Sequence, residues 1–245
     1  MSLPKAVVVG VGAEDGLGAA LCRCYATNDR HVLVAGRSLE KVEKVAAAIR
    51  GNGGRATAYA VDATREEDVV RLFDAAMTND EDGGPADLVT HNVGLNRNID
   101  FRQMEVSTFE DFWRLNTLSG FLVGREAARS FAPLGRGSVF FTGATGSLRG
   151  MPGFAHFAAS KAGLRMISQS MAREFGPRGI HVAHVIVDGA IDCERVRSLF
   201  GAFEQFGENG MLNPEAVAET YWQLHLQHPS AWTQELDVRP FKKQF

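Results

Sequence analysis

The stretch Lys5-Ala-Val-Val-Val-Gly-Val-Gly-Ala-Glu-Asp-Gly-Leu-Gly18 decides the fold. Residues 6–11 form a continuous apolar run, which is typical of a strand buried on both faces. Gly12, Gly16 and Gly18 follow where a helix over 17–27 is expected to begin. Glycines permit a tight turn and a close backbone approach, and a helix amino terminus presents free N–H groups at its positive end. A glycine loop in this position predicts a binding site for the diphosphate of a dinucleotide.

Strand and helix patterns alternate along the rest of the chain. We expect strands at 6–11, 31–35, 56–61, 86–91, 137–142, 180–187 and 233–238, and helices at 17–27, 39–50, 65–77, 107–131, 154–175, 192–206 and 214–227. Such alternation predicts parallel strands joined by right-handed crossovers. We therefore expect one α/β domain over residues 1–245, Rossmann-like and doubly wound, with a mainly parallel sheet of about seven strands and helices on both faces. Ligands should bind beyond the carboxyl ends of the strands.

The composition limits the classes of partner. The 245 residues are 45% hydrophobic and carry a net charge of −3, and lysine and arginine form no basic run. We expect no nucleic-acid partner and no membrane partner. Cys22, Cys24 and Cys193 have no metal-like spacing, which argues against zinc and disulfides and favours the reducing cytoplasm. We therefore expect no bound metal. No leader-like segment precedes the first strand, so we also expect a cytoplasmic protein.

The end of the second strand bears on the choice of coenzyme. A fold selecting NAD usually has an acidic residue there, which accepts hydrogen bonds from the adenosine ribose. This chain has Gly36, followed by Arg37, and a guanidinium suits a ribose phosphate. The pattern favours NADP(H), with NAD(H) as the alternative. Arg37 as a solvated residue or an adenine-stacking residue remains open. Glu14 and Asp15 oppose a phosphate unless they point outward.

Taken in order over residues 5–192, these motifs resemble the short-chain dehydrogenase/reductase family. The resemblance implies a cofactor site at Gly12, Gly16, Leu17 and Gly18, at Asp62 and Ala63 beside the adenine, at Asn92 and Gly94 after the fourth strand, and at Gly189 and Ile191 beside the nicotinamide. Arg37 belongs to the same predicted site. Asp188 stands where the family has proline, and Cys193 where it has threonine.

The same resemblance implies a catalytic set of asparagine, serine, tyrosine and lysine. Asn116 and Lys161 occupy the first and last of these positions, and Lys161 is also expected to bind the nicotinamide ribose. The serine position holds Ala144 and the tyrosine position holds Phe157. Residues four apart share one helix face, so Phe157 and Lys161 should point the same way. The chain therefore resembles an atypical branch of the family, without the usual proton carrier.

Several groups are candidates to replace the missing acid. Thr145 is the preferred hydroxyl donor, whereas Thr142 is expected to end a strand. Lys161 itself is another candidate, moving protons through a ribose hydroxyl or water without a tyrosine in between. His156, expected to be partly exposed at a helix start, and Asp188 are further candidates. Phe157 and Ala144 together leave an apolar pocket in which no hydroxyl lacks a hydrogen-bond partner. The two replacements are therefore consistent with each other.

The leading functional hypothesis is an NAD(P)(H)-dependent oxidoreductase acting on a carbonyl or alcohol of a fairly apolar small molecule. The alternative is an NAD(P)-binding protein with little or no turnover, acting as a sensor or partner subunit. Residues 192–212 are expected to form a substrate lid, in which Phe200, Phe203 and Phe206 either pack in the core or form an apolar wall. By the resemblance, the two long helices should pair between subunits in a homodimer or homotetramer.

Overall fold

The computed structural model describes residues 3–200 and 206–243, and within them the centre is a seven-stranded sheet in which every pairing is parallel. The strand order is β3-β2-β1-β4-β5-β6-β7. The strands are β1 (Pro4–Val9), β2 (His31–Gly36), β3 (Arg55–Ala60), β4 (Gly84–His91), β5 (Gly137–Ala144), β6 (Ile180–Val187) and β7 (Glu235–Val238). The order reverses between β1 and β4, which makes this pair the switch point beside which ligands bind in open α/β sheets.

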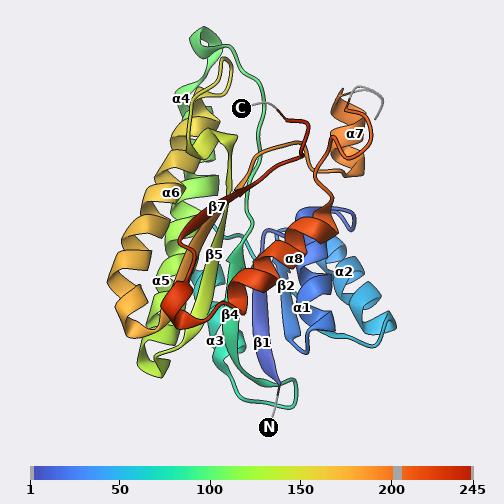
Figure 1. The fold of residues 1–245 in the computed structure, drawn as a ribbon, viewed down its shortest axis with the longest axis vertical. Coiled ribbons are helices and arrows are strands. Elements are labelled where there is room, and N and C mark those ends of the chain that lie inside the picture. The colour runs from blue at the N-terminus through green and yellow to red at the C-terminus, as the bar shows by residue number, and fades with distance from the viewer. Residues whose placement is uncertain (1–2, 201–205, 244–245) are drawn as a thin grey trace.

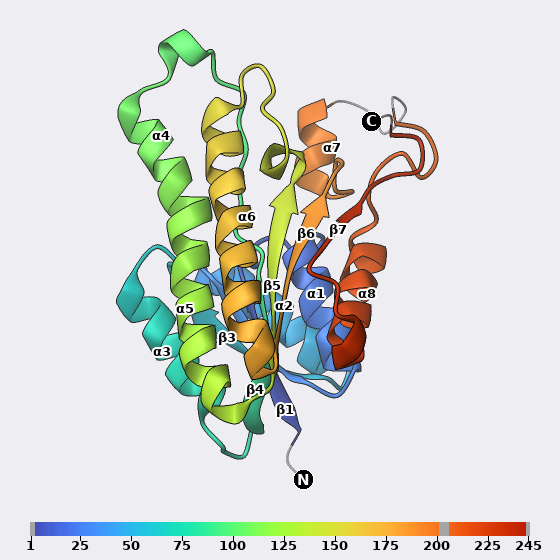
Figure 2. The ribbon, with the colours of Figure 1, turned by 60° about the vertical axis from the view of Figure 1, so that its left-hand side comes forward.

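Helices cover both faces of the sheet (Figures 1 and 2). One layer consists of α1 (Leu17–Thr27), α2 (Leu39–Gly51) and α8 (Pro214–His225), and the other of α3 (Glu66–Met77), α5 (Ser119–Phe131) and α6 (Ala155–Phe175). Successive β1 residues point to opposite faces of the sheet. Ala6 and Val8 pack in the core under the first layer, and Val7 and Val9 pack in the core under the second. The predicted Rossmann-like, doubly wound α/β fold is confirmed.

The first strand ends two residues earlier than the apolar run suggested. Gly10 adopts φ +99°, a left-handed conformation that favours glycine. The backbone N–H groups of Gly10 and Val11 both donate to the Ala35 carbonyl oxygen, at 2.9 and 3.0 Å. The chain therefore leaves the sheet at Gly10 and crosses toward β2, which places the glycine loop above the ends of both strands.

The single helix expected over 107–131 is divided. It comprises α4 (Val106–Trp113), a π-helical turn (Arg114–Leu118) and α5, and the Ser119 N–H donates to the Arg114 carbonyl oxygen five residues back. The apolar periodicity predicted a helix here, but it did not predict the extra residue that the π-helical turn contains. π-turns inside α-helices often occur at functional sites, and this one contains Asn116.

The segment expected to act as a lid leaves and rejoins the fold at neighbouring points. The Asp192 N–H donates to the Leu212 carbonyl oxygen and the Leu212 N–H to the Ala190 carbonyl oxygen, both at 2.8 Å. Its helix, α7 (Glu194–Phe200), lies within the expected 192–206, and residues 201–205 are outside the described part of the chain. Phe203 lies outside the described residues, so the predicted aromatic stripe stays a prediction.

Among residues 3–200 and 206–243, no helix is long and apolar enough to cross a membrane. The same residues contain no cluster of three histidine, cysteine or acidic side chains able to hold a metal ion.

Candidate active site

The glycine loop borders open space. α1 begins after Gly16 with no side-chain cap, so the N–H groups of its first turn, from Leu17 and Gly18 onward, point away from the helix without a side-chain partner. A Cβ added to Gly12 would meet no atom within 4 Å, whereas one added to Gly18 would lie 3.0 Å from Val11 Cα. Gly18 is thus needed for helix–strand packing, and Gly12 leaves the backbone open to a ligand.

Asn92 ties this loop to the neighbouring strand. Its Nδ2 donates to the Gly10 carbonyl oxygen at 3.4 Å, and its backbone N–H donates to the Val9 carbonyl oxygen at 2.8 Å. A Cβ at Gly10 would fall 2.7 Å from the Asn92 backbone. From the family resemblance we expected Asn92 to cross-link the central strands. In the structure its hydrogen bonds to Val9 and Gly10 join the segments that follow β4 and β1 at the switch point.

The predicted adenosine end of the site is bounded by β2 and β3. A Cβ at Gly36 would lie 2.2 Å from the Val11 carbonyl oxygen, so packing excludes any side chain there. Arg37 is exposed, and no described residue forms an ion pair with it. Asp62 Oδ1 accepts hydrogen bonds from the Thr64 N–H and hydroxyl, at 3.0 and 2.7 Å, and no described residue bonds its Oδ2. Ala63 beside it is buried.

The two acids of the glycine loop are directed outward. Glu14 and Asp15 are both exposed. The Asp15 carboxylate accepts a hydrogen bond from the Glu194 N–H at the start of α7. The loop acids therefore do not fill the space in front of the first turn of α1, and one of them connects the loop to the predicted lid.

Lys161 projects from α6 to the ends of β4 and β5. Its Nζ donates to the carbonyl oxygens of Val93, at 3.1 Å, and Thr142, at 2.9 Å. Its side chain is buried, and burial lowers the pKa of Lys161 to about 7. A Cβ on Gly94 would lie 3.2 Å from Nζ. Because its pKa is close to 7, the buried Lys161 amine can gain or lose a proton near neutrality.

Asn116 lies next to the lysine, in the π-turn. Its Nδ2 donates to the Phe112 carbonyl oxygen at 3.0 Å and to Ser160 Oγ at 3.1 Å. Its Oδ1 is buried and no described residue donates to it. A Cβ on Gly94 would lie 3.6 Å from that oxygen. Lys161 and Asn116, predicted together from separate motifs, thus converge beneath Gly94.

The two positions without a hydroxyl are connected through the loop that follows β5. Ala144 ends β5, and its N–H donates to Ser147 Oγ at 3.1 Å. A Cβ on Gly146 would lie 3.0 Å from the Phe157 ring, so this ring covers the loop that follows Ala144. The apolar pairing expected of Phe157 and Ala144 fits this arrangement.

The candidate proton donors differ in what their side chains contact. The hydroxyls of Thr142 and Tyr221 share a hydrogen bond of 2.8 Å beneath α8, away from Lys161. His156 was expected to be partly exposed, which is wrong: it is 1% exposed and packs edge-on against Phe112, with ring centroids 4.2 Å apart. Burial lowers the pKa of His156, so it is neutral near pH 7.

Asp188 is a poor acid in this environment. Burial alone would raise its pKa, but hydrogen bonds from the Lys243 ammonium and the Thr145 hydroxyl, with the charges of Lys243 and Arg149, lower it below the ordinary value. Asp188 is therefore ionised near neutrality, which makes it the less suitable of the candidate proton donors. The Thr145 hydroxyl is engaged by the same carboxylate.

Sequence reasoning missed a buried polar layer under the site. His184 Nε2 lies 3.1 Å from Ser147 Oγ, and His91 Nε2 lies 2.8 Å from Ser119 Oγ. Burial lowers the pKa of His184 to about 4 and of His91 to about 3, and the Lys161 charge contributes to both. The detectable signal was a histidine inside a buried strand, since His184 interrupts the apolar run Val182–Val187 of β6.

The residues after β7 pack on the predicted nicotinamide end of the site. A Cβ on Gly189 would lie 2.7 Å from Pro240 Cδ, so the chain after β7 packs directly on this glycine. Ile191 is half-buried and forms a parallel bridge with Leu212. Both predicted residues therefore lie at the carboxyl end of β6, beside the base of the predicted lid.

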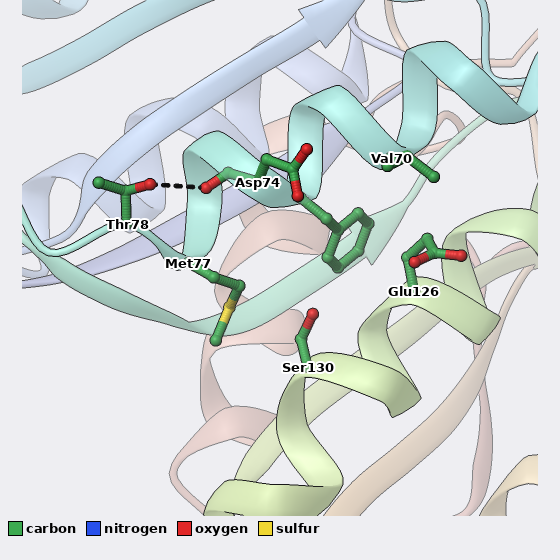
Figure 3. Close-up of a pocket in the computed structure, with 7 residues that line it drawn as sticks. Val70, Asp74, Met77, Thr78, Glu126 and Ser130 are labelled. Carbon is green, nitrogen blue, oxygen red and sulfur yellow. Dashed lines mark hydrogen bonds between the residues drawn. The ribbon is translucent and has the colours of Figure 1, made fainter.

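A groove of about 400 Å³ lies elsewhere, between α3 and α5 (Figure 3). It is lined by Val70, Phe73, Asp74, Met77, Thr78, Glu126 and Ser130. The Thr78 hydroxyl donates to the Asp74 carbonyl oxygen at 2.8 Å. None of the predicted site residues borders this groove.

Comparison with known proteins agrees with the geometry. Residues 5–200 match the family described as short chain dehydrogenase. A solved short-chain dehydrogenase from Rhodopseudomonas palustris is 39% identical, with a TM-score of 0.79, over 96% of this chain and 99% of that chain. Gluconate 5-dehydrogenase of Gluconobacter oxydans is 26% identical over 181 residues, which are 74% of this chain and 70% of that protein.

A metagenomic short-chain oxidoreductase, solved in complex with NADP, shares the fold with a TM-score of 0.80 at 22% identity and 98% coverage of both chains.

Proposed function

Because the chain belongs to the short-chain dehydrogenase/reductase family of NAD(P)-dependent oxidoreductases, we propose that it oxidises an alcohol or reduces a carbonyl without the usual tyrosine. Its substrate is a fairly apolar small molecule, and its preferred coenzyme is NADP(H). The observation that carries the proposal is Lys161, buried and bonded to two backbone carbonyls where the family residues converge.

The residues present fit a dinucleotide. The open backbone at Gly12 and the uncapped first turn of α1 suit a diphosphate. Asp62 Oδ2 suits the adenine amino group, and the unpaired Arg37 suits a ribose 2′-phosphate. The metagenomic relative in complex with NADP supports the same preference. When bound, the nicotinamide supplies the site that gives or accepts a hydride.

Lys161 is the residue that holds the exchangeable proton. Two of its three N–H donors are bonded to Val93 and Thr142, and the third remains for a ligand. Asn116 steadies the turn against Ser160, while Phe157 and Ala144 shape an apolar pocket. Thr145 is less suited to donate to a substrate than the sequence suggested, because its hydroxyl is engaged by Asp188.

An apolar substrate is supported by the loops around this pocket. Leu95, Leu148 and Met151 follow the ends of β4 and β5 and are between 38% and 53% exposed. With Phe157 they offer apolar surface to a substrate. Burying such groups against a ligand contributes about 25 cal/mol per Å².

Coenzyme binding tests the first half of the proposal. A coenzyme at one hundred times its dissociation constant stabilises the folded protein by about 2.7 kcal/mol. For 245 residues this raises the melting temperature by roughly 5–10 °C. We expect that shift with NADPH and a smaller one with NADH at the same concentration. The absence of a shift with either coenzyme at saturating concentration would contradict the proposal.

Turnover tests the second half. A panel of ketones and aldehydes is offered with NADPH to the parent, to Lys161→Ala and to Arg173→Ala, a matched change of an exposed cation on the same helix. We expect Lys161→Ala to reduce kcat/KM by about 10²-fold or more and Arg173→Ala to leave it unchanged.

A second candidate function is favoured by the missing hydroxyls of Phe157 and Ala144. In this alternative the protein binds NAD(P) with little or no turnover, as a sensor or partner subunit. The double variant Ala144→Ser with Phe157→Tyr separates the two functions. Activity that appears only in the double variant supports the binding protein, and activity already present in the parent supports the oxidoreductase.

A further inference from the structure

Asp188 is the centre of a charged cluster that the proposed chemistry does not use. Its side chain is 2% exposed and follows directly after β6. Lys243 and Thr145 both bond Oδ1, and Lys243 Nζ also lies 3.4 Å from Thr145 Oγ1. Arg149 and Arg239 approach Oδ2 at 3.8 and 3.9 Å. Three cations thus surround one buried carboxylate.

The arginine of the β5 loop has donors to spare. The 3.8 Å separation between Arg149 and Asp188 Oδ2 is too long for a hydrogen bond. The side chain is 43% exposed, and no described residue accepts a hydrogen bond from it. Its planar guanidinium is therefore held beside the cluster by charge alone, with its N–H groups able to grip an anion bidentately.

Among the described residues, the cluster joins three cations, Arg149, Arg239 and Lys243, to the carboxylates of Asp188 and Asp237. The Lys243–Asp188 ion pair alone would be enough to attach the carboxyl-terminal segment to the end of β6. Additional cations around a satisfied carboxylate leave a favourable place for one more anionic group.

The position of the cluster identifies which ligand would supply that group. Asp188, Thr145 and Arg239 follow the carboxyl ends of β6, β5 and β7, and Thr145 adjoins Ala144. The glycine loop lies at the ends of β1 and β2, across the switch point (Figure 1). The coenzyme diphosphate is therefore held elsewhere, and the cluster faces the substrate half of the site.

We infer that the substrate carries an anionic group, a carboxylate or a phosphate, which Arg149 and Lys243 bind beside Asp188. This inference rests on the proposed oxidoreductase function and names its substrate class. The substrate then has a reacting carbonyl or alcohol near Lys161, an apolar body against Phe157 and Leu148, and an anionic end at the cluster. Arg149 and Lys243 are the residues that determine this specificity.

The experiment compares matched ligands by calorimetry, with and without saturating NADP⁺. The probes are 4-acetylbenzoate, its neutral methyl ester and 4-acetylphenyl phosphate, together with inorganic phosphate and acetate. The variants are Arg149→Gln and Lys243→Gln, and the control is Lys242→Gln, the neighbouring exposed lysine, which lies over the Phe241 ring. The carboxylate and phosphate arms distinguish the two kinds of anion.

We expect at least one anionic ketone to bind about ten-fold or more tightly than the ester. Arg149→Gln and Lys243→Gln should each remove that preference, while Lys242→Gln keeps it and all variants bind NADPH equally. Equal binding of acid and ester by the parent, or a preference that survives both substitutions, overturns the inference. If the parent does not bind NADPH, the proposed function is contradicted. The binding of the acid and ester probes measured without coenzyme still tests whether the cluster binds an anion.

Discussion

At the scale of single residues, the charge of Lys161 is what distinguishes this site. In the unfolded chain a lysine has a pKa near 10.4, and in the folded protein burial lowers that of Lys161 to about 7. Between these values the unfolded state binds more protons, so this residue makes the protein more stable as pH rises through the window. Below about pH 7 both states are protonated, and the burial penalty is fully present.

Lys161→Met should remove this dependence. We expect the difference in unfolding free energy between parent and variant to change by roughly 1.4 kcal/mol per pH unit between about pH 7 and 9.5, in favour of the parent at higher pH. Urea denaturation of the coenzyme-free proteins measures it, and Arg173→Met is the control. A difference that does not vary with pH would mean that the lysine is already solvated.

Arg37 allows a second residue-scale prediction. Because its guanidinium is exposed and has no described acidic partner, Arg37→Gln should weaken NADPH binding about ten-fold or more and leave NADH binding unchanged. Calorimetry with both coenzymes checks this, with the exposed Arg71→Gln as control. If both coenzymes weaken equally, Arg37 stacks on the adenine and does not select the phosphate.

At the scale of elements, β5 and β6 pack through an unusual pair. A Cβ on Gly143 would lie 2.2 Å from His184 Nε2, so the imidazole occupies the space of the missing side chain. The same ring lies 3.1 Å from Ser147 Oγ, which in turn accepts from the Ala144 N–H. The position of the loop after β5 therefore depends on a histidine of the next strand.

Gly143→Ala should destabilise the protein by roughly 1–3 kcal/mol through overpacking. Combined with His184→Ala, the same change should cost much less, because the clashing ring is gone. Denaturant unfolding of the four proteins of this double-mutant cycle measures the coupling. Additive effects would show that His184 moves aside without cost.

Local sequence patterns predicted the elements far better than the contacts between them. The buried run and the alternating patterns predicted a mainly parallel sheet of about seven strands, and the four-residue spacing placed Phe157 and Lys161 on one helix face. The π-turn at Asn116 was not predictable, because an inserted residue leaves the apolar periodicity on either side intact. The burial of His156 was missed because it depends on Phe112, 44 positions earlier in the chain.

At the scale of the whole molecule, one helical layer exposes large apolar side chains. Phe109 and Trp113 of α4 and Phe121 of α5 are 41–45% exposed, and Met166 of α6 is 49% exposed. α4 and α5 run side by side with α6 (Figure 2). We propose that this layer pairs with a second copy, which agrees with the homodimer or homotetramer expected from the family.

The double change Trp113→Glu with Phe121→Glu should weaken this association by at least about 100-fold, because it places charges in an apolar interface. Light scattering after size-exclusion chromatography measures the assembly, and Leu226→Glu at the far end of α8 is the control. A parent that is monomeric at high micromolar concentration would contradict the proposed pairing.

The close approach of Val11 to Gly36 constrains how this enzyme can be redesigned. Swapping an Asp into position 36, the obvious route to an NAD-specific catalyst, would drive its first side-chain carbon into a main-chain oxygen only 2.2 Å away. A design that aims at NAD binding through an acidic side chain must therefore use a position other than 36, and the neighbouring exposed residue is Arg37.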